Sequence, residues 1–217
     1  MVRRSLLCSW LLAGCLSAPV ERSAGSDCDP VAFSADFDQD GWREVGWGRS
    51  DESAGGELRA EGGRAVIASD GDAGSYGWYG TTSSYDVSGR CLQVDVPVMF
   101  VSGEDVATEA YLGVYLGDEW VAVGQSGGDL CCLHERGDTT LSGGCALDYS
   151  PEAHARWRLR FDAGAFACDV APASGAWSEV GRFSYGGPLD GFIELLAGTW
   201  DDMGAEPGEV AFDNLNL

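Results

Sequence analysis

Three aromatic residues are spaced so that they would share one face of a short hairpin. The pair Gly117-Asp118 is typical of a two-residue turn between two segments of alternating polarity. In that register Tyr115 lies opposite Trp120, and Tyr111 lies on the same face. Tyr and Trp join a flat apolar ring to a polar group, so an exposed set of them can stack on sugar rings. The alternative is that these rings pack inside the protein, as most large aromatics do.

The opposite face of the same hairpin is apolar and suits a core; it contains Leu112, Val114, Val121 and Val123. The Gly- and Ser-rich segment 74–89 brings further aromatics, among them Trp78 and Tyr79. Loops that carry aromatics on a rigid scaffold are natural ligand sites. We therefore expect Trp78 and Tyr79 at the rim of the same surface, although the segment could be a simple connection.

Three carboxylates alternate just before a glycine near the start of the folded region. Asp36, Asp38 and Asp40 precede Gly41 in a D-x-D-x-D-G pattern, and alternate carboxylates before a turn can wrap a calcium ion. The longer helix–loop–helix pattern fails, because Trp47 stands where its glutamate should be. The sequence thus offers a structural calcium site, with a solvated acidic turn as the alternative.

Patterns for catalysis are incomplete. Ser126 lies in a G-x-S-x-G motif, but no helix follows it, and neither His134 nor His154 has the context of a general base. A glycosidase needs two carboxylates that project together into a cleft. Glu194 stands alone in its apolar segment, and no Glu-x-Asp-x-x-Glu arrangement occurs in the chain. The sequence therefore favours a non-catalytic protein over a hydrolase.

The chain opens like an export signal. A short basic start precedes the apolar segment 6–14, which is too short to cross a bilayer as a helix. Residues 12–15, Leu-Ala-Gly-Cys, resemble the lipobox of bacterial lipoproteins, in which a peptidase cuts before an acylated cysteine. The resemblance implies that 1–14 is a signal peptide and that Cys15 carries lipid and anchors the protein in a membrane. An ordinary signal peptide cut near Ala18 is the alternative.

The rest of the chain divides into a tether and one domain. Residues 15–27 are small and polar, as in a flexible linker, and 28–217 is long enough for one domain with a substantial core. Leu16 after the anchor supplies no acidic retention signal of the kind some bacteria use. We therefore expect an exported lipoprotein of the bacterial cell envelope, with the outer membrane favoured.

The cysteines that follow the anchor are even in number: Cys28, Cys91, Cys131, Cys132, Cys145 and Cys168. In an exported protein such a set predicts disulfides, with fifteen possible connectivities that the sequence leaves open. The neighbours Cys131 and Cys132 should face different partners. A zinc site that adds His134 is the alternative, but the spacing lacks the C-x2-C pairs of structural zinc sites.

Short alternating segments separated by glycine-rich turns run through 31–217, and no segment has a helical period. This pattern predicts an all-β, antiparallel sandwich or jelly roll. Segments 33–42, 154–160 and 208–214 resemble strands of concanavalin A-like (laminin G-like) jelly-roll domains. In that family the closing Phe-Asp-Asn strand, here 212–214, pairs near the first strand. The segment 129–145, with three cysteines, departs from the family pattern.

Composition limits the classes of partner. The formal net charge is −22, and all thirteen basic residues are arginines. Such a charge repels phosphate backbones, so nucleic-acid binding is not expected. Hydrophobic residues make up 45% of the chain, which argues against disorder. The sequence favours an envelope-anchored lipoprotein that recognises a glycan; a structural or protein-interaction lipoprotein and a glycan-active hydrolase are the alternatives.

Overall fold

The computed structural model describes residues 28–35, 37, 47–50, 55–101, 106–162 and 164–216. Every regular element in these ranges is a strand, and they contain no helix long and apolar enough to cross a membrane. The segment that resembles a lipobox, Cys15 and the tether lie outside the described residues. So do Asp36, Asp38 and Asp40, and the calcium hypothesis stays a prediction.

Two eight-stranded sheets make up the fold. The first, here the β7 sheet, has the order β14-β13-β12-β7-β16-β4-β3, with β1 beside β7. Its strands are β1 (Asp29–Pro30), β3 (Gly56–Glu61), β4 (Arg64–Ser69), β7 (Arg90–Val98), β12 (Arg156–Asp162), β13 (Ala165–Ala171), β14 (Ser178–Ser184) and β16 (Gly208–Asp213). All its pairings are antiparallel except the short pairing of β1 with β7.

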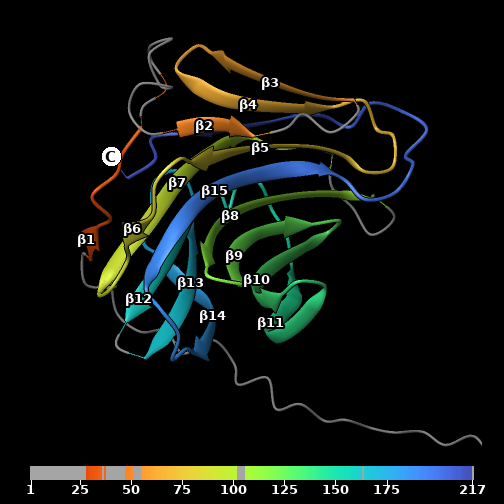
Figure 1. Cartoon of the computed structure of the whole chain (residues 1–217). Helices are drawn as coiled ribbons and strands as arrows, with labels where there is room; N and C mark the ends of the chain where they lie inside the picture. The colour runs from red at the N-terminus through yellow and green to blue at the C-terminus, as the bar shows by residue number, and fades with distance from the viewer. Residues whose placement is uncertain are drawn as a thin grey trace, which may run out of the picture.

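The second, here the β8 sheet, has the order β11-β10-β9-β8-β15-β5-β2, with β6 beside β15. Its strands are β2 (Trp47–Ser50), β5 (Ser75–Thr81), β6 (Tyr85–Asp86), β8 (Thr108–Leu116), β9 (Glu119–Ser126), β10 (Asp129–Arg136), β11 (Thr139–Asp148) and β15 (Asp190–Thr199). Its strands β15, β8, β9 and β10 curve in front of β12, β13 and β14 (Figure 1). The predicted all-β sandwich is confirmed.

The core lies between the two sheets and follows the period-two alternation of the strands. Leu92 and Val94 of β7 point inward and meet Leu112 and Val114 of β8 in one apolar cluster, while Gln93 points away. Each sheet therefore buries one face and leaves the other to solvent. The bridge between Ala35 and Leu215 also places the end of the chain beside its first described segment, as the family resemblance implied.

All six predicted cysteines form disulfides: Cys28–Cys91, Cys131–Cys145 and Cys132–Cys168. Cys131 and Cys132 face different partners, as expected, because successive residues of a strand point to opposite faces. Cys132–Cys168 crosses the core from β10 to β13, whereas Cys131–Cys145 joins β10 to β11 across their hairpin. The alternative of a zinc site is wrong, because these thiols are already bonded in pairs.

The bond that links the two sheets should contribute strongly to stability. Cys132 and Cys168 are 36 residues apart, and the chain-entropy estimate for such a loop is roughly 4 kcal/mol. We expect the double variant Cys132→Ala/Cys168→Ala to lose about 2–4 kcal/mol in urea unfolding. Cys131→Ala/Cys145→Ala is the matched control. It removes a disulfide whose cysteines are only 14 residues apart, so it should lose less unfolding free energy. An unchanged urea midpoint for the first variant would contradict this role.

Candidate functional site

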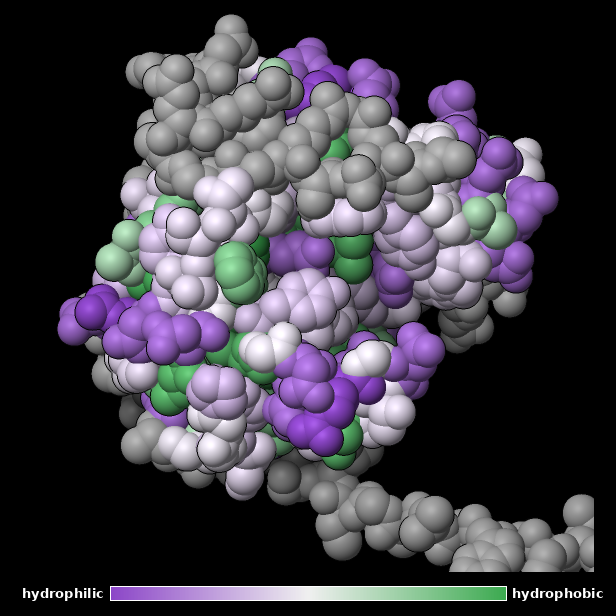
Figure 2. Space-filling view, viewed as in Figure 1, coloured by the Kyte–Doolittle hydropathy of each residue, from purple (hydrophilic) through white to green (hydrophobic). Residues whose placement is uncertain are grey.

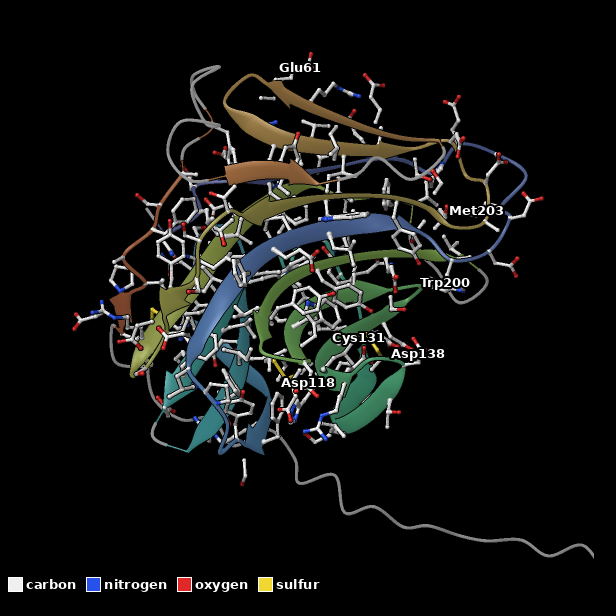
Figure 3. All side chains as sticks on the ribbon, viewed as in Figure 1. Glu61, Asp118, Cys131, Asp138, Trp200 and Met203 are labelled. Atoms are coloured by element: carbon white, nitrogen blue, oxygen red, sulfur yellow. A yellow bond between two sulfur atoms is a disulfide. The ribbon has the colours of Figure 1, made fainter. Side chains whose placement is uncertain are left out.

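The solvent-facing side of the β8 sheet, here called the open face, presents four rows of side chains across neighbouring strands. Register pairs Phe192 of β15 with Tyr115 of β8, and Tyr115 with Trp120 of β9. The next three rows bring Glu194 opposite Gly113, Leu196 opposite Tyr111, and Gly198 opposite Glu109. In Figure 3 this face lies between Trp200, just past the end of β15, and Asp118, in the turn between β8 and β9.

Phe192, Tyr115 and Trp120 form what we call the aromatic row. Tyr115 is 44% exposed and Phe192 is 47% exposed, unusually high fractions for large rings, and Trp120 is half-buried. The rings of Tyr115 and Trp120 lie 6.3 Å apart and tilt by 36°. The row therefore offers neighbouring ring faces to a flat ligand.

Glycines on the neighbouring strands make room for these rings. A Cβ atom added to Gly113 would lie 2.4 Å from the Trp120 indole nitrogen, and one added to Gly124 would lie 2.6 Å from the Tyr111 ring. The indole and the phenol ring thus lie flat across backbone that carries no side chain. Any larger residue at Gly113 would displace Trp120 from the row.

Glu194 is the chemically unusual residue of the open face. Its side chain is 8% exposed, and Oε2 is buried without a hydrogen-bond partner among the described residues. The Trp120 indole nitrogen is buried, lies over Gly113 opposite Glu194 and directs its N–H at the Glu194 carboxyl group. Burial raises the pKa of Glu194 to about 7, and the hydrogen bond from the Trp120 side chain offsets part of the rise. A carboxyl group that keeps part of its protons near neutral pH and an indole N–H thus stand side by side below the aromatic row.

A second carboxylate of this face is held by tyrosines. Burial raises the pKa of Glu109, and hydrogen bonds from Tyr76 and Tyr111 oppose the rise. Tyr76 lies against Gly198, as Trp120 does against Gly113. Glu135, at the far side of the face on β10, accepts a hydrogen bond of 3.2 Å from Thr140 in the β10–β11 hairpin. The carboxylates of Glu109, Glu135 and Glu194 therefore have different surroundings.

The structure separates the predicted site residues. Tyr115, Trp120 and Trp78 lie on the open face, because Trp78 is in register with Leu196 and Tyr111. Tyr111 is only 4% exposed and packs edge-on against Trp120, so it supports the surface from below. Figure 2 looks onto this side of the molecule and shows a recess near its centre.

The placement of Tyr79 was wrong. Its ring is 1% exposed in the core, and its hydroxyl donates a hydrogen bond of 2.9 Å to the carbonyl of Arg59. The expected loop is strand β5, in which Trp78 and Tyr79 must point to opposite faces. Tyr76, two residues before Trp78 and therefore on the open-face side of β5, is an aromatic residue of the site that the sequence pattern did not indicate.

The serine-nucleophile pattern has no support from the geometry. Ser126 ends strand β9, and the chain turns directly into β10 rather than into a helix. His134 points to the core side, where it stacks on Phe183 and contacts Glu119 at 2.8 Å. Among the described residues no three His, Cys, Asp or Glu side chains are grouped as metal ligands.

The fold is shared with glucanases. A prokaryotic β-1,3-1,4-glucanase (lichenase) from a mouse hindgut metagenome matches with TM-score 0.59 and 14% identity, over 83% of this chain and 98% of its own. The Bacillus licheniformis β-glucanase gives 0.60 at 10% identity, over 86% and 96%. A β-1,3-glucanase from Mycobacterium marinum gives 0.60 at 14%, over 86% and 97%. No protein-family profile and no curated protein sequence matches the chain. The chain thus has the concanavalin A-like jelly-roll fold that its sequence predicted.

Proposed function

We propose that this protein binds a neutral glycan chain on the open face of the β8 sheet and does not cleave it. The observation that carries the proposal is the exposed aromatic row beside the buried carboxyl group of Glu194. Sugar rings present apolar C–H faces to aromatic rings and hydroxyl groups to polar atoms. The structural neighbours named for glucan hydrolysis add support for a glycan as the ligand.

The polar atoms below the row fit a sugar hydroxyl. A hydroxyl group both donates and accepts, and Glu194 Oε2, which is buried without a hydrogen-bond partner among the described residues, offers it an acceptor beside the Trp120 indole. A buried polar atom without a partner is costly, so a ligand that supplies the missing hydrogen bonds gains free energy. Across β15, β8, β9 and β10, register places four charged groups on these rows, Glu109, Asp129, Glu135 and Glu194, and all of them are carboxylates, which disfavours an anionic glycan.

The backbone spacing of the same carboxylates favours binding over glycoside cleavage, although the Glu135 side chain reaches near enough to Glu109 to raise its pKa. Glycosidases hold their acid and base about 5–9.5 Å apart. Glu194 lies opposite Gly113, four residues along β8 from Glu109, so their backbones are about 13 Å apart along the strands. Glu135 is three strands away from Glu194, or about 14 Å across the sheet. Glu109 is also held by the tyrosine hydroxyls. We therefore assign Glu194 to binding.

Anchoring by lipid at Cys15 belongs to the same proposal and places the domain at the cell envelope. A tether of thirteen residues before Cys28 would let the open face reach glycan near the membrane. We expect Cys15→Ser to move the protein from the membrane fraction to the soluble fraction and to abolish labelling by a fatty-acid analogue. A Cys15→Ser variant that stays in the membrane fraction and takes up the fatty-acid label at the wild-type level would contradict lipidation at this residue.

The proposal is tested by binding and cleavage measured together. The purified protein is run in native gels that contain β-1,3-1,4-glucan, β-1,3-glucan or a uronic-acid polymer, and reducing ends are measured in parallel. We expect retardation by a neutral glucan, none by the anionic polymer, and no new reducing ends. New reducing ends would establish the hydrolase instead. A protein that no glycan retards would favour a structural or protein-interaction role.

A further inference from the structure

A second hollow lies on the outer face of the β7 sheet, on the side of the core opposite the open face. It has a volume of about 250 Å³ and is lined by Gln93, Asp95, Arg156, Ala173, Trp177 and Asn214. Gln93 and Asp95 alternate along β7 with the core residues Leu92 and Val94, so they must point away from the core. The sandwich therefore separates this hollow from the aromatic row.

One wall of the hollow is a tryptophan fixed by two arginines. The Trp177 ring lies 4.4 Å from the guanidinium carbon of Arg158 and 4.8 Å from that of Arg156. Arg156 also holds the backbone of the same segment, donating hydrogen bonds to the carbonyls of Pro172 at 3.0 Å and Gly175 at 2.6 Å. The ring is thus held in place before any ligand arrives, which lowers the entropic cost of binding.

The facing wall carries hydrogen-bonding groups. Asn214 has a left-handed backbone conformation with φ of 51°, and its amide donates a hydrogen bond of 2.9 Å to Asp95 Oδ2. The backbone N–H of the neighbouring Gln93 donates to Asn216 Oδ1 at 2.9 Å. These contacts tie the end of the chain to β7 and set a carboxylate and an amide at the edge of the hollow.

The charges of the hollow select the class of ligand. Arg156 and Asp95 balance one another, and Arg158 is paired with Asp169 at 2.9 Å. Asp95 would repel an anionic ligand, and the guanidinium groups of Arg156 and Arg158 would repel a cationic one. The remaining chemistry is an indole ring, a carboxylate and amides, which suits a neutral ring with several hydroxyl groups. The volume lies below the roughly 300–1,000 Å³ of pockets for drug-sized molecules and suits one such ring.

We propose that this hollow is a second sugar-binding site, which takes a single pyranose unit stacked on Trp177 and hydrogen-bonded to Asp95. With the open face on the other sheet, it would let one molecule hold two glycan chains at once. Two linked sites raise the apparent affinity for a polymer without any new contact at either site.

The test follows the indole N–H signals of the full chain by NMR, with Trp177→Phe and Trp120→Phe variants to assign the two signals. The probes are methyl β-glucopyranoside and a β-1,3-1,4-linked glucose tetrasaccharide. We expect a saturable shift of the Trp177 signal with both probes. Asp95→Asn, which keeps the size and the fold, should weaken the shift at least tenfold, and Trp120→Phe should leave it unchanged.

The outcomes separate the two proposals. A Trp177 signal that moves while that of Trp120 does not would support the second site and contradict binding on the open face. A Trp120 signal that moves alone would overturn the second site and leave the proposed function standing. If neither indole signal shifts, both the second site and glycan binding on the open face are overturned. A Trp177 shift that Asp95→Asn does not weaken would overturn the assigned pose.

Discussion

Replacement of Trp120 by alanine should reduce affinity for a neutral glucan oligosaccharide by at least about thirtyfold. A central aromatic anchor contributes about 2 kcal/mol or more to a binding surface, and each 1.4 kcal/mol corresponds to tenfold. The change would remove both the ring of the row and the N–H beside Glu194. Isothermal titration calorimetry measures the effect directly.

Two variants keep the Trp120 experiment interpretable. Trp120→Phe retains a ring over Gly113 but lacks the N–H, so it should lose only part of the affinity. Leu147→Ala removes an exposed apolar side chain on β11, away from the row, and should bind like the wild type. Equal affinity for Trp120→Ala and the wild type, with an unchanged thermal midpoint, would show that the row does not hold the ligand.

Replacement of Glu194 by glutamine should stabilise the protein at pH 8 and leave it nearly unchanged at pH 4. Burial raises the pKa of Glu194 from 4.5 to about 7 in the folded state. Between these values the unfolded chain has lost the proton and the folded chain has kept it, so stability of the wild type falls as pH rises. The shift corresponds to about 3 kcal/mol once both states are ionised. Glutamine stays neutral throughout and avoids this loss.

Urea unfolding at a series of pH values measures that difference. The gap between Glu194→Gln and the wild type should open between about pH 4.5 and pH 7 and then level off. Glu135→Gln, which removes a half-buried carboxylate of the same face, is the matched control for the loss of one acidic group. A constant gap from pH 4 to pH 8 would mean that Glu194 ionises normally in the folded protein.

The parts of the site that depend on local sequence were predictable. The Gly117-Asp118 turn fixes the register of β8 and β9, and alternation then decides which residues face solvent. The pairing of Tyr115 with Trp120 and the core role of Val114 follow from these two signals alone. The three disulfides suit an oxidising compartment, and the export signal stays a prediction.

The parts that depend on distant strands were not predictable. Glu194 looks like a lone acid in an apolar segment, and its role emerges only when β15 pairs with β8 and sets it opposite Gly113. Strand β5 has the sequence Ser-Tyr-Gly-Trp-Tyr-Gly-Thr, whose glycines suggest a loop. Its Gly77 instead admits the side chains of Leu58 and Ile67, a contact between sheets that no local pattern reveals.

The β10–β11 hairpin is a third example. Its cysteines and glycines departed from the family pattern, and the sequence offered no strand there. In the structure Gly143 has a left-handed backbone with φ of 86°. A Cβ atom added to Gly143 would also lie only 2.0 Å from the carbonyl oxygen of Cys132, so only glycine fits this strand position. The hairpin is exposed along β11 and is joined to the sheet by Cys131–Cys145.

Crystals of the protein grown with a β-1,3-1,4-linked glucose oligosaccharide give the most direct test of glycan binding on the open face. We predict an intact oligosaccharide stacked on Tyr115 and Trp120, with one hydroxyl group hydrogen-bonded to Glu194 Oε2 beside the Trp120 indole. An open face that stays empty at ligand concentrations that saturate the protein in solution, or a ligand cleaved beside Glu194, would contradict it.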